Sequence, residues 1–281
     1  MPDWETLLPL LVHIQANLES DLSLTALSAK AGLSPFHLQR LFRAIVGETP
    51  KAYTQRLRME RAAFRLLLHE TPLLEIALDC GFQNHETFTR AFRRHYGQPP
   101  SDYRQWIREQ AAEQEQQPTA PVPAQFAISA TKVIRLRPMH VAFVRHTGPY
   151  EAVPESLFDQ LEQWRAARRL PGPAVWLGIG HDSPALTPPE KLRFDAALEV
   201  AGPFAPEGVI AHQWLPGGEF AVTTHAGPYD TLPEAYAQIF PRALALPNHR
   251  LIGLPAVEIY RATRITLTHR MNQTDICLPV S

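Results

Sequence analysis

The sequence lacks the features that mark secreted, metal-binding or membrane proteins. It contains 2 cysteines in 281 residues, and Cys80 and Cys277 lie too far apart to predict a disulfide framework or a zinc cluster. We expect both to be reduced, buried thiols. No window approaches about 18 uninterrupted apolar residues, and the first residues lack the basic and apolar regions of a signal peptide. We therefore expect a cytoplasmic protein with no membrane partner.

Signatures of the common enzyme classes are also missing. There is no His-Glu-x-x-His, no Gly-x-Ser-x-Gly, no P-loop and no convincing dinucleotide fingerprint. These absences argue against metallopeptidases, serine hydrolases and nucleotide-dependent enzymes. We expect no cofactor, no metal and no catalytic residue.

Net charge is nearly absent, because 27 Lys and Arg face 28 Asp and Glu. The distribution along the chain is nevertheless uneven. Residues 30–65 hold eight basic residues against two acidic ones, and residues 85–108 hold five against two. Such local basic segments predict contact with a polyanion, which the total charge conceals.

A helical pattern occurs twice in the first part of the chain. Five residues recur at an offset of fifty, namely Arg40, Phe42, Gly47, Pro50 and Tyr53 as Arg90, Phe92, Gly97, Pro100 and Tyr103. Each copy has the layout of a helix-turn-helix: in the first, residues 24–31 form a short helix, Gly32 permits the turn, and Ser34 caps the second helix before Pro35. The repeat predicts two similar units in tandem.

The second helix of each unit has one polar, basic face. Apolar residues at helical spacing face inward and leave Phe36, Gln39, Arg40 and Arg43 on the opposite side. Arg can pair with guanine, Gln with adenine, and Phe can contact a thymine methyl. The predicted DNA contacts are Phe36, His37, Gln39, Arg40, Arg43, His85, Glu86, Thr87, Arg90, Arg93 and Arg94. The alternative is that both faces are merely solvated, but duplication in register favours DNA.

A helix expected at residues 52–68 separates the two units. It would be about 25 Å long at about 1.5 Å per residue. Such a rod could hold the two outward helices about one DNA turn apart, roughly 34 Å. One chain would then bind two successive major grooves as a monomer.

The composition changes after the helical part. Residues 111–130 are rich in Glu, Gln and Pro, which predicts a flexible, partly extended linker. We therefore expect a DNA-binding domain at 1–110, the linker at 111–130, and a second domain at 131–281 in which short β-rich runs alternate with two helical stretches.

The second domain is also a repeat. His146-Thr-Gly-Pro-Tyr150 returns as His225-Ala-Gly-Pro-Tyr229, and later segments recur at nearly the same offset. Each half is predicted to run strand, Gly-Pro turn, helix, strand, strand. Two such halves should pack around a pseudo-twofold axis, and pockets tend to form at such junctions.

The repeat places Trp176 and Glu258 at equivalent positions, and Tyr260 shares the strand face of Glu258. A carboxylate among aromatic rings suits an organic cation, through countercharge and cation–π attraction. The predicted ligand-binding residues are Glu258, Tyr260, Trp176, Trp214, Phe194, Tyr150 and Tyr229. The alternative is that Glu258 is an exposed strand residue and that each Trp only fills the core.

The first part of the chain resembles a known family. Residues 29–34, 36–40, 81–82 and 92–100 are similar to the AraC/XylS transcriptional regulators, especially the MarA, SoxS and Rob group. The resemblance implies base contacts by Phe36, Gln39 and Arg40, and by Glu86, Thr87 and Arg90. Glu86 departs from the uncharged polar residue common at that position, which puts the second half-site in doubt.

Residues 131–281 resemble the GyrI-like, Rob-type effector-binding domain. The resemblance rests on residues 146–155, 225–234, 258–260 and 275–280, and it implies binding of lipophilic or cationic drugs through Glu258. Together the two resemblances imply a multidomain protein, all-α tandem helix-turn-helix followed by α+β. Its implied partners are promoter DNA, a small-molecule effector and RNA polymerase as a candidate.

Two other functions stay open for the second domain. Some GyrI-like domains hydrolyse electrophilic toxins, and here Glu258 with Tyr150 or Tyr229 could serve that chemistry. The domain could also be a protein-binding module like the gyrase inhibitor that gives the family its name. We expect a regulator and not an enzyme.

Overall fold

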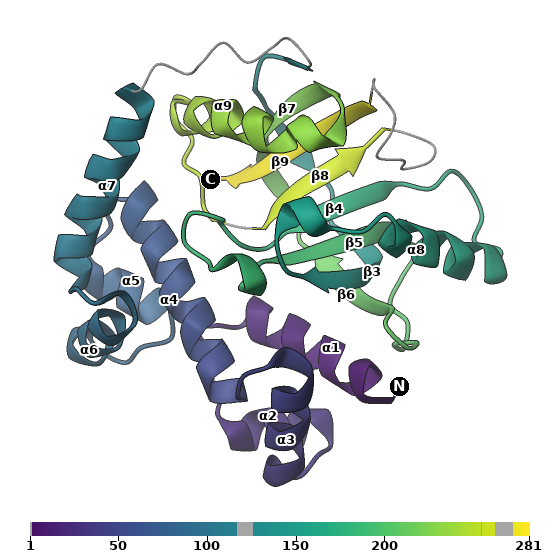
Figure 1. Ribbon diagram of the computed structural model, residues 1–281, viewed down its shortest axis with the longest axis horizontal. Helices are drawn as coiled ribbons and strands as arrows, with labels where there is room; N and C mark the ends of the chain where they lie inside the picture. Colours follow the sequence, from purple (N-terminus) through teal and green to yellow (C-terminus); the bar gives the residue numbers. More distant parts are fainter. Residues whose placement is uncertain (1, 117–125, 254, 262–271) are drawn as a thin grey trace. The chain divides into compact units, whose positions relative to one another are not determined.

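The computed structural model describes residues 2–116, 126–253, 255–261 and 272–281. They belong to two compact units, Met1–Ala120 and Pro121–Ser281, each coloured by sequence in Figure 1. The predicted linker is too long at its start, because the last helix of the first unit continues to Gln116. The rest of that prediction falls partly on residues 117–125, which lie outside the described residues.

The described part of the first unit is entirely helical. Its helices are α1 (Pro2–Ala16), α2 (Leu24–Ala31), α3 (Pro35–Val46), α4 (Pro50–Leu68), α5 (Leu73–Asp79), α6 (His85–Tyr96) and α7 (Pro100–Gln116). Helices α2 and α3 form one helix-turn-helix, α5 and α6 form the other, and α4 lies between them in sequence. The predicted tandem arrangement is confirmed.

The two helix-turn-helix copies use the same residues to start and end their second helices. Ser34 and Asn84 cap α3 and α6, each accepting a hydrogen bond from the backbone N–H three residues on, at 3.3 and 2.9 Å. Gly47 and Gly97 end these helices in the left-handed conformation, with φ of 79° and 80°, which glycine adopts without steric cost. The repeated residues therefore fix the length of both helices.

The repeated aromatic residues also play equivalent roles in packing. Phe42 meets Tyr53 edge to face with ring centroids 5.4 Å apart, and Phe92 meets Tyr103 in the same way at 5.2 Å. Edge-to-face pairs at such distances are favourable beyond the area that they bury. Each pair fixes its outward helix to the helix that follows.

Arg58 of α4 joins the two helix-turn-helix copies within the first unit. Its guanidinium donates to the carbonyl oxygens of Leu18 and Ser20, at 2.8 and 3.0 Å. The turn of the second helix-turn-helix approaches the same point, since a Cβ on Gly81 would lie 2.5 Å from Arg58 Nη2. Gly81 also has a φ of 75°, so a larger residue would be strained there as well as crowded.

The second unit is built on one sheet that contains nine strands in its described part. The strands are β1 (Ala127–Ile128), β2 (Lys132–Leu136), β3 (Met139–Thr147), β4 (Trp176–Gly180), β5 (Arg193–Val200), β6 (Ala211–Leu215), β7 (Gly218–Gly227), β8 (Ala256–Tyr260) and β9 (Asn272–Val280). The order across the sheet is β1-β7-β9-β8-β4-β5-β3-β6, with β2 also paired to β7. The helices are α8 (Ser156–Ala167) and α9 (Leu232–Leu244), with 3-10 turns η1 (Tyr150–Ala152), η2 (Pro189–Lys191) and η3 (Tyr229–Thr231).

The predicted internal repeat is confirmed. One half runs β3-η1-α8-β4-β5, and the other runs β7-η3-α9-β8-β9. The halves meet where β4 pairs with β8, and the equivalent residues Leu177 and Ile259 are direct partners there. Strands β2 and β6, which we did not predict, cross between halves: β2 pairs with β7, and β6 pairs with β3.

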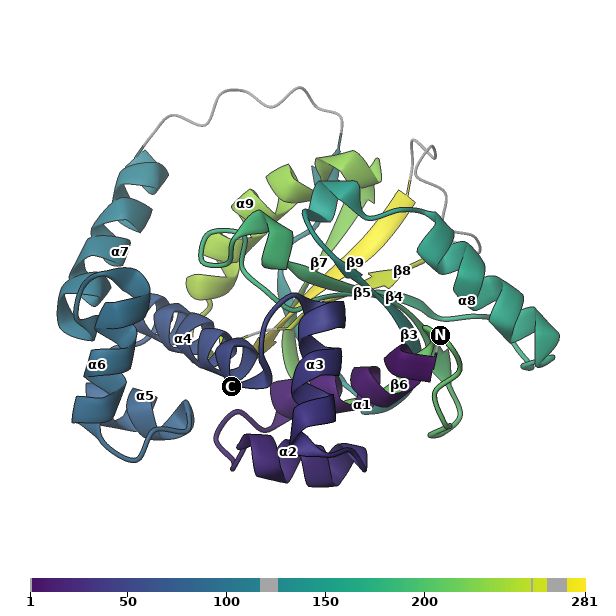
Figure 2. The ribbon, with the colours of Figure 1, turned by 60° about the horizontal axis from the view of Figure 1, so that its bottom comes forward.

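Helices α8 and α9 cover the same face of the sheet (Figures 1 and 2). Leu157, Phe158 and Leu161 of α8 pack on Ala142 and Leu198 of the sheet. Leu232 at the start of α9 packs against the same core. The core of this unit therefore lies between one face of β4, β5 and β8 and the two helices.

The predicted state of the cysteines is confirmed, because both are free and buried. Burial raises the pKa of Cys80 to about 11 and that of Cys277 to about 12. Among the described residues, no helix is both long and apolar enough to cross a bilayer.

Candidate functional site

Helices α3 and α6, called the recognition helices below, each have one buried and one exposed face. Leu38, Leu41 and Phe42 are buried in α3, and Phe88, Ala91 and Phe92 are buried in α6. The predicted contact residues lie on the other side. Those exposed are Phe36, His37, Gln39, Arg40, Arg43, His85, Glu86, Arg90, Arg93 and Arg94. Phe36 is 79% exposed, which is unusual for so apolar a side chain.

Thr87 differs from its neighbours because it is half buried. Its hydroxyl lies 3.1 Å from the Asn84 carbonyl oxygen and 3.0 Å from the Asn84 side-chain oxygen. Thr87 thus takes part in the cap of α6. Its predicted contact with a base stays a prediction.

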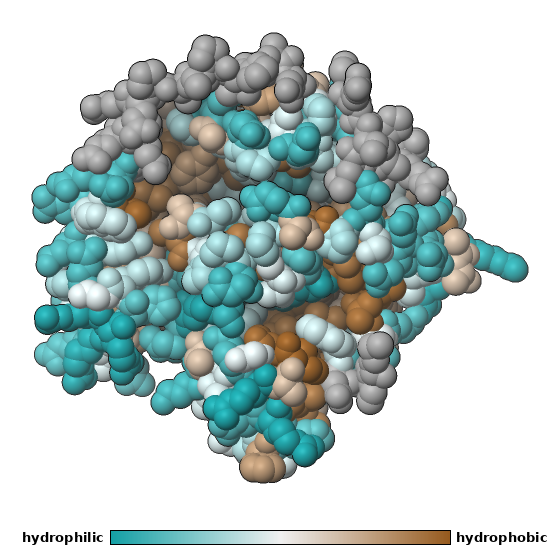
Figure 3. All heavy atoms as spheres, in the orientation of Figure 1, coloured by the Kyte–Doolittle hydropathy of each residue, from teal (hydrophilic) through white to brown (hydrophobic). Residues whose placement is uncertain are grey.

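The arginines of the basic segments fall into two groups. Arg40, Arg43, Arg90, Arg93 and Arg94 make no recorded ion pair within the described part of the chain. Their charge is therefore available at the surface. Side chains over α6 and α7 are mostly hydrophilic on the face drawn in Figure 3.

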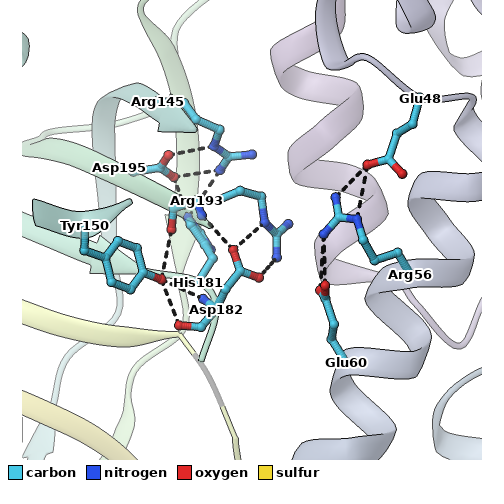
Figure 4. Close-up of polar contacts among 9 residues, drawn as sticks. All are labelled: Glu48, Arg56, Glu60, Arg145, Tyr150, His181, Asp182, Arg193 and Asp195. Carbon is cyan, nitrogen blue, oxygen red and sulfur yellow. Dashed lines mark hydrogen bonds and ion pairs between the residues drawn. The ribbon is translucent and has the colours of Figure 1, made fainter. Parts of the chain in front are cut away.

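The arginines of α4 and α7 are occupied internally. Arg56 pairs with Glu48 at 2.7 Å and with Glu60 at 3.1 Å (Figure 4). Arg65 pairs with Asp79, and Arg108 donates to the carbonyl oxygen of Leu66 at 3.2 Å. Counting charge along the sequence thus overstated the free positive charge, because several of these arginines tie helices together.

In the second unit, Glu258 of β8 lies beneath the helices and is 8% exposed. Its Oε1 accepts a hydrogen bond from the Tyr236 hydroxyl at 3.0 Å, and its Oε2 accepts one from the Tyr260 hydroxyl at 2.5 Å. Burial raises the pKa of Glu258, although both tyrosine hydroxyls favour the charged form. The alternative of an exposed strand residue is wrong.

Gly178 of β4 is the strand partner of Glu258 and leaves room for this pair. A Cβ on Gly178 would lie 2.7 Å from Phe194 Cζ and 3.0 Å from Glu258 Oε2, and it would collide with the Tyr260 hydroxyl. The space above one glycine therefore holds a carboxylate, a phenol and an aromatic ring together.

The structure brings six of the seven predicted ligand-binding residues into one neighbourhood. Trp176 is the strand partner of Tyr260, and the Tyr229 ring lies 5.4 Å from that of Tyr260. Tyr150 lies 6.3 Å from Phe194 between ring centroids. We call the set Glu258, Tyr260, Trp176, Phe194, Tyr150 and Tyr229 the Glu258 cluster.

Trp214 lies apart from this cluster. It is on β6, the last strand in the order at that edge of the sheet, and it is 50% exposed. Its ring contacts that of His140 in a tilted arrangement, with centroids 4.6 Å apart. The prediction grouped it with the others by residue type alone, because nothing in the local sequence indicates that β6 pairs with β3.

A polar network holds Tyr150 in place (Figure 4). The Tyr150 hydroxyl donates to the carbonyl oxygen of Asp182 at 2.8 Å, and the Asp182 carboxylate pairs with Arg193 at 2.5 Å. Beside it, Asp195 pairs with Arg145 at 2.7 Å. Burial acts to raise the pKa of Asp195, but the charges and hydrogen bonds of Arg145 and His181 together outweigh it and hold this pKa low.

Sequence reasoning missed three residues that contact or make room for the Glu258 cluster. Tyr236 contacts the carboxylate from α9, Phe158 packs edge to face on Trp176 and Tyr260 from α8, and Gly178 provides the space. Tyr236 follows buried Ala235 in an amphipathic helix, which indicates a helix face but not the strand that it meets. The described residues contain no group of His, Cys, Asp and Glu that could hold a metal ion.

Comparisons with known proteins agree with this architecture. The family model described as a GyrI-like small molecule binding domain matches residues 130–281. The chain belongs to the GyrI-like family. A second model, described as a helix-turn-helix domain, matches residues 27–105, so an AraC-type helix-turn-helix domain precedes the GyrI-like domain.

The curated relatives match the helical part. The "Right origin-binding protein" of Escherichia coli K12 is 41% identical over 95 residues, which cover 34% of this chain and 33% of the relative. The "Regulatory protein SoxS" of the same strain is 36% identical over 95 residues, covering 34% of this chain and 89% of the relative. The match thus spans about a third of the length of the first of these relatives.

Among solved structures, the match to EcmrR in its complex with DNA covers 92% of this chain and 98% of the EcmrR chain, with 16% identity and a TM-score of 0.44. An AraC-type regulator from Chromobacterium violaceum covers 40% of this chain and 94% of its own, with 29% identity and a TM-score of 0.34.

Proposed function

We propose that this GyrI-like protein is a transcription regulator that binds promoter DNA through its two recognition helices and a small effector through its Glu258 cluster. The observation that carries the proposal is the duplicated recognition helix, with free arginines at equivalent positions in both copies. Relatives of the helical part are named as regulatory and origin-binding proteins, which supports a regulatory, DNA-binding role here. We also propose that the protein contacts RNA polymerase and acts in the cytoplasm.

Each recognition helix would enter a major groove. Arg40 and Arg90, at equivalent positions, would contact base edges, with Gln39 beside the first and Glu86 near the second. Arg93 and Arg94 would contact phosphates, which position a protein without specifying sequence. Exposed Phe36 would meet a thymine methyl group. An acid such as Glu86 could accept from cytosine N4 but would be repelled by a nearby phosphate.

Two variants test the DNA proposal. Arg40→Ala should lose about 1–3 kcal/mol at its base pair and relax discrimination there. Arg93→Ala should weaken binding to all sequences similarly and reduce the salt dependence of binding. Binding is measured by fluorescence anisotropy on a selected operator and on random DNA at several salt concentrations. Equal affinity of both variants for the two DNAs would contradict the assignment.

The effector would be hydrophobic and cationic. A buried carboxylate supplies the countercharge, and Trp176, Phe194 and the tyrosines supply aromatic faces for cation–π contact. Both carboxylate oxygens already accept hydrogen bonds from Tyr236 and Tyr260. A cation therefore has to compete with these hydroxyl groups, which favours ligands that also bury apolar surface.

Glu258→Gln tests the effector proposal. The amide keeps the size of the side chain and removes its charge, so affinity for hydrophobic cations should fall while affinity for neutral compounds of similar shape should not. The measurement is a thermal-shift screen followed by calorimetric titration. Undiminished cation affinity in the variant would remove Glu258 from the site.

The hydrolase alternative has one supporting observation, the raised pKa of a carboxyl in contact with tyrosine hydroxyls. Among the candidate tyrosines, Tyr150 uses its hydroxyl to bind Asp182. Incubation with electrophilic compounds distinguishes the functions, because an enzyme consumes the compound at a steady rate and Glu258→Gln stops it. Saturable binding with the compound unchanged favours the effector site.

A further inference from the structure

Three buried polar atoms beside the Glu258 cluster have no hydrogen-bond partner in the described part of the chain. They are His225 Nδ1, Thr274 Oγ1 and the Tyr229 hydroxyl oxygen. His225 and Thr274 are 0% exposed, and Tyr229 is 8% exposed. Buried polar groups are nearly always paired, and leaving one unpaired costs free energy. Three together indicate that a polar group from elsewhere belongs there.

His225 and Thr274 adjoin each other, and Tyr260 of the Glu258 cluster contacts both Thr274 and Tyr229. His225 of β7 is the direct strand partner of Thr274 of β9. Thr274 is in turn the partner of Tyr260 on β8, and the Tyr229 ring packs on Tyr260. Since direct partners share a sheet face, the polar atoms continue the row that starts at Tyr260. We call His225, Thr274 and Tyr229 the polar subsite.

The hydrogen bonds define what the polar subsite can accept. Thr231 donates its hydroxyl proton to the carbonyl oxygen of Pro228 at 2.7 Å, so its oxygen accepts from His225 Nε2 at 2.8 Å. Burial lowers the pKa of His225, which favours the neutral ring. With its proton on Nε2, the neutral ring presents a lone pair at Nδ1. The subsite therefore offers one acceptor and two hydroxyl groups.

The other half of the repeat keeps only part of this arrangement: Nε2 of His146, the equivalent of His225, also has no hydrogen-bond partner in the described residues, but the two unpaired hydroxyl groups have no counterpart. Phe194 occupies the position equivalent to Thr274, since Asp195 and Asp275 are equivalent and each follows it directly. Tyr150, the equivalent of Tyr229, has its hydroxyl bound to Asp182. The unpaired hydroxyl groups of Thr274 and Tyr229 are thus a property of one half and do not follow from the fold alone.

We propose that the polar subsite binds a neutral group of the effector that donates a hydrogen bond, a hydroxyl or an N–H, while the cationic centre of the same molecule lies at Glu258. This inference rests on the proposed effector function of Glu258. Thr274 is a diagonal neighbour of Glu258 across β8 and β9, and such neighbours are about 7–8 Å apart. A quaternary ammonium with a short hydroxyalkyl arm can reach both groups, because the contact distances at its two ends add to the length of the arm.

Two probes of equal size test the proposal. Benzyldimethyl(2-hydroxyethyl)ammonium carries the hydroxyl, and benzyldimethylpropylammonium carries a methyl group in its place. We expect the full-length protein to bind the hydroxyl probe about tenfold more tightly in calorimetric titration, the range of one charge-free hydrogen bond to a buried group. In Thr274→Val this preference should shrink to about twofold or less, with affinity for the propyl probe unchanged.

The stability of the variant without ligand provides a second readout. Thr274→Val removes an unpaired buried hydroxyl and keeps the shape of the side chain, so the melting temperature should rise. The matched control is Thr223→Val in the same sheet, because the Thr223 hydroxyl is paired with Thr131 at 2.8 Å. The control should melt at a lower temperature and keep the preference for the hydroxyl probe.

The outcomes separate this inference from the function on which it rests. The polar subsite is overturned if the wild type binds both probes equally, or if the preference survives in Thr274→Val. In that case, weaker binding of both probes to Glu258→Gln would show that the cation site exists without the polar subsite. A lower melting temperature for Thr274→Val also overturns the subsite, because the hydroxyl would then serve a structural bond. If neither probe binds, both the cation site and the subsite are contradicted for this ligand class.

Discussion

At the scale of single residues, the ionisation of Glu258 links stability to ligand binding. Its pKa is raised in the folded protein, mainly by burial. Between the ordinary value, about 4.5 for glutamate, and the raised value, the folded state therefore holds more protons than the unfolded state. The free energy of unfolding must then fall as pH rises through that window.

This predicts opposite pH trends for two measurements. From pH 4.5 upward, wild type should lose stability relative to Glu258→Gln in urea denaturation, because only the wild type must ionise a buried carboxyl. Over the same window its affinity for a hydrophobic cation should rise, because the carboxylate charge is what the cation binds. A stability difference that does not change with pH would show that Glu258 has an ordinary pKa.

Gly178 gives a second prediction at this scale. Gly178→Ala places a methyl group against Tyr260, Phe194 and Glu258, and overpacking of this kind costs about 1–3 kcal/mol. We expect a loss of that size in urea denaturation, together with weaker cation binding. Gly202→Ala is the matched control, since a Cβ there meets nothing within 4 Å. Equal stability of the two variants would contradict the crowding at Gly178.

Single residues were predicted to different degrees. Most of the predicted DNA contacts lie on exposed helix faces because helical spacing alone decides which side is apolar. The internal repeat brought Trp176 and Glu258 together, and strand alternation added Tyr260, whereas the places of Tyr236 and Trp214 depend on which strands and helices pack together. Arg56 and Arg58 could not be told from surface arginines by sequence, because their partners are set by helix packing.

At the scale of elements, the recognition helices depend on their caps. Ser34→Ala and Asn84→Ala each remove the side-chain oxygen that binds a helix N-terminal N–H. Each should cost about 1 kcal/mol of stability, since that is typical of a lost N-cap. Thermal or urea unfolding of the helical unit measures the loss.

The control for the caps is Ser101→Ala on α7, whose hydroxyl bonds the adjacent Asp102 carboxylate. It should change the free energy of unfolding by less than either cap variant. A loss as large as theirs would mean that removal of any serine hydroxyl, and not the cap, is being measured.

Elements with strong local signals were predicted well. The helix at Leu24–Ala31 and the Ser34 cap were predicted at the residues where they occur, because proline, glycine and cap residues act locally. Strands β2 and β6 were not predicted, because β2 is short and charged and β6 mixes polar and aromatic residues. Both patterns are common where a strand lies near a sheet edge. Their pairing partners also lie in the opposite half of the repeat.

At the scale of the whole molecule, two units with separate cores predict separable functions. Fragments 1–116 and 126–281 should each unfold cooperatively in calorimetry. A hydrophobic cation should raise the melting temperature of the second fragment alone, and operator DNA should raise that of the first alone, because a ligand stabilises only the fold that binds it. A fragment that does not melt cooperatively would contradict independent folding.

The clamp of Arg58 on the loop at Leu18 and the turn at Gly81 has a consequence for how promoters can vary. Helix α4 has 19 residues, and each residue added to it would turn the second recognition helix by about 100° while advancing it about 1.5 Å. One base pair advances DNA by about 3.4 Å and turns it by about 36°. An added base pair therefore changes the rotation and spacing of the half-sites in a way that the fixed recognition helices cannot follow. The gap between the two half-sites should be invariant across every gene that this regulator controls.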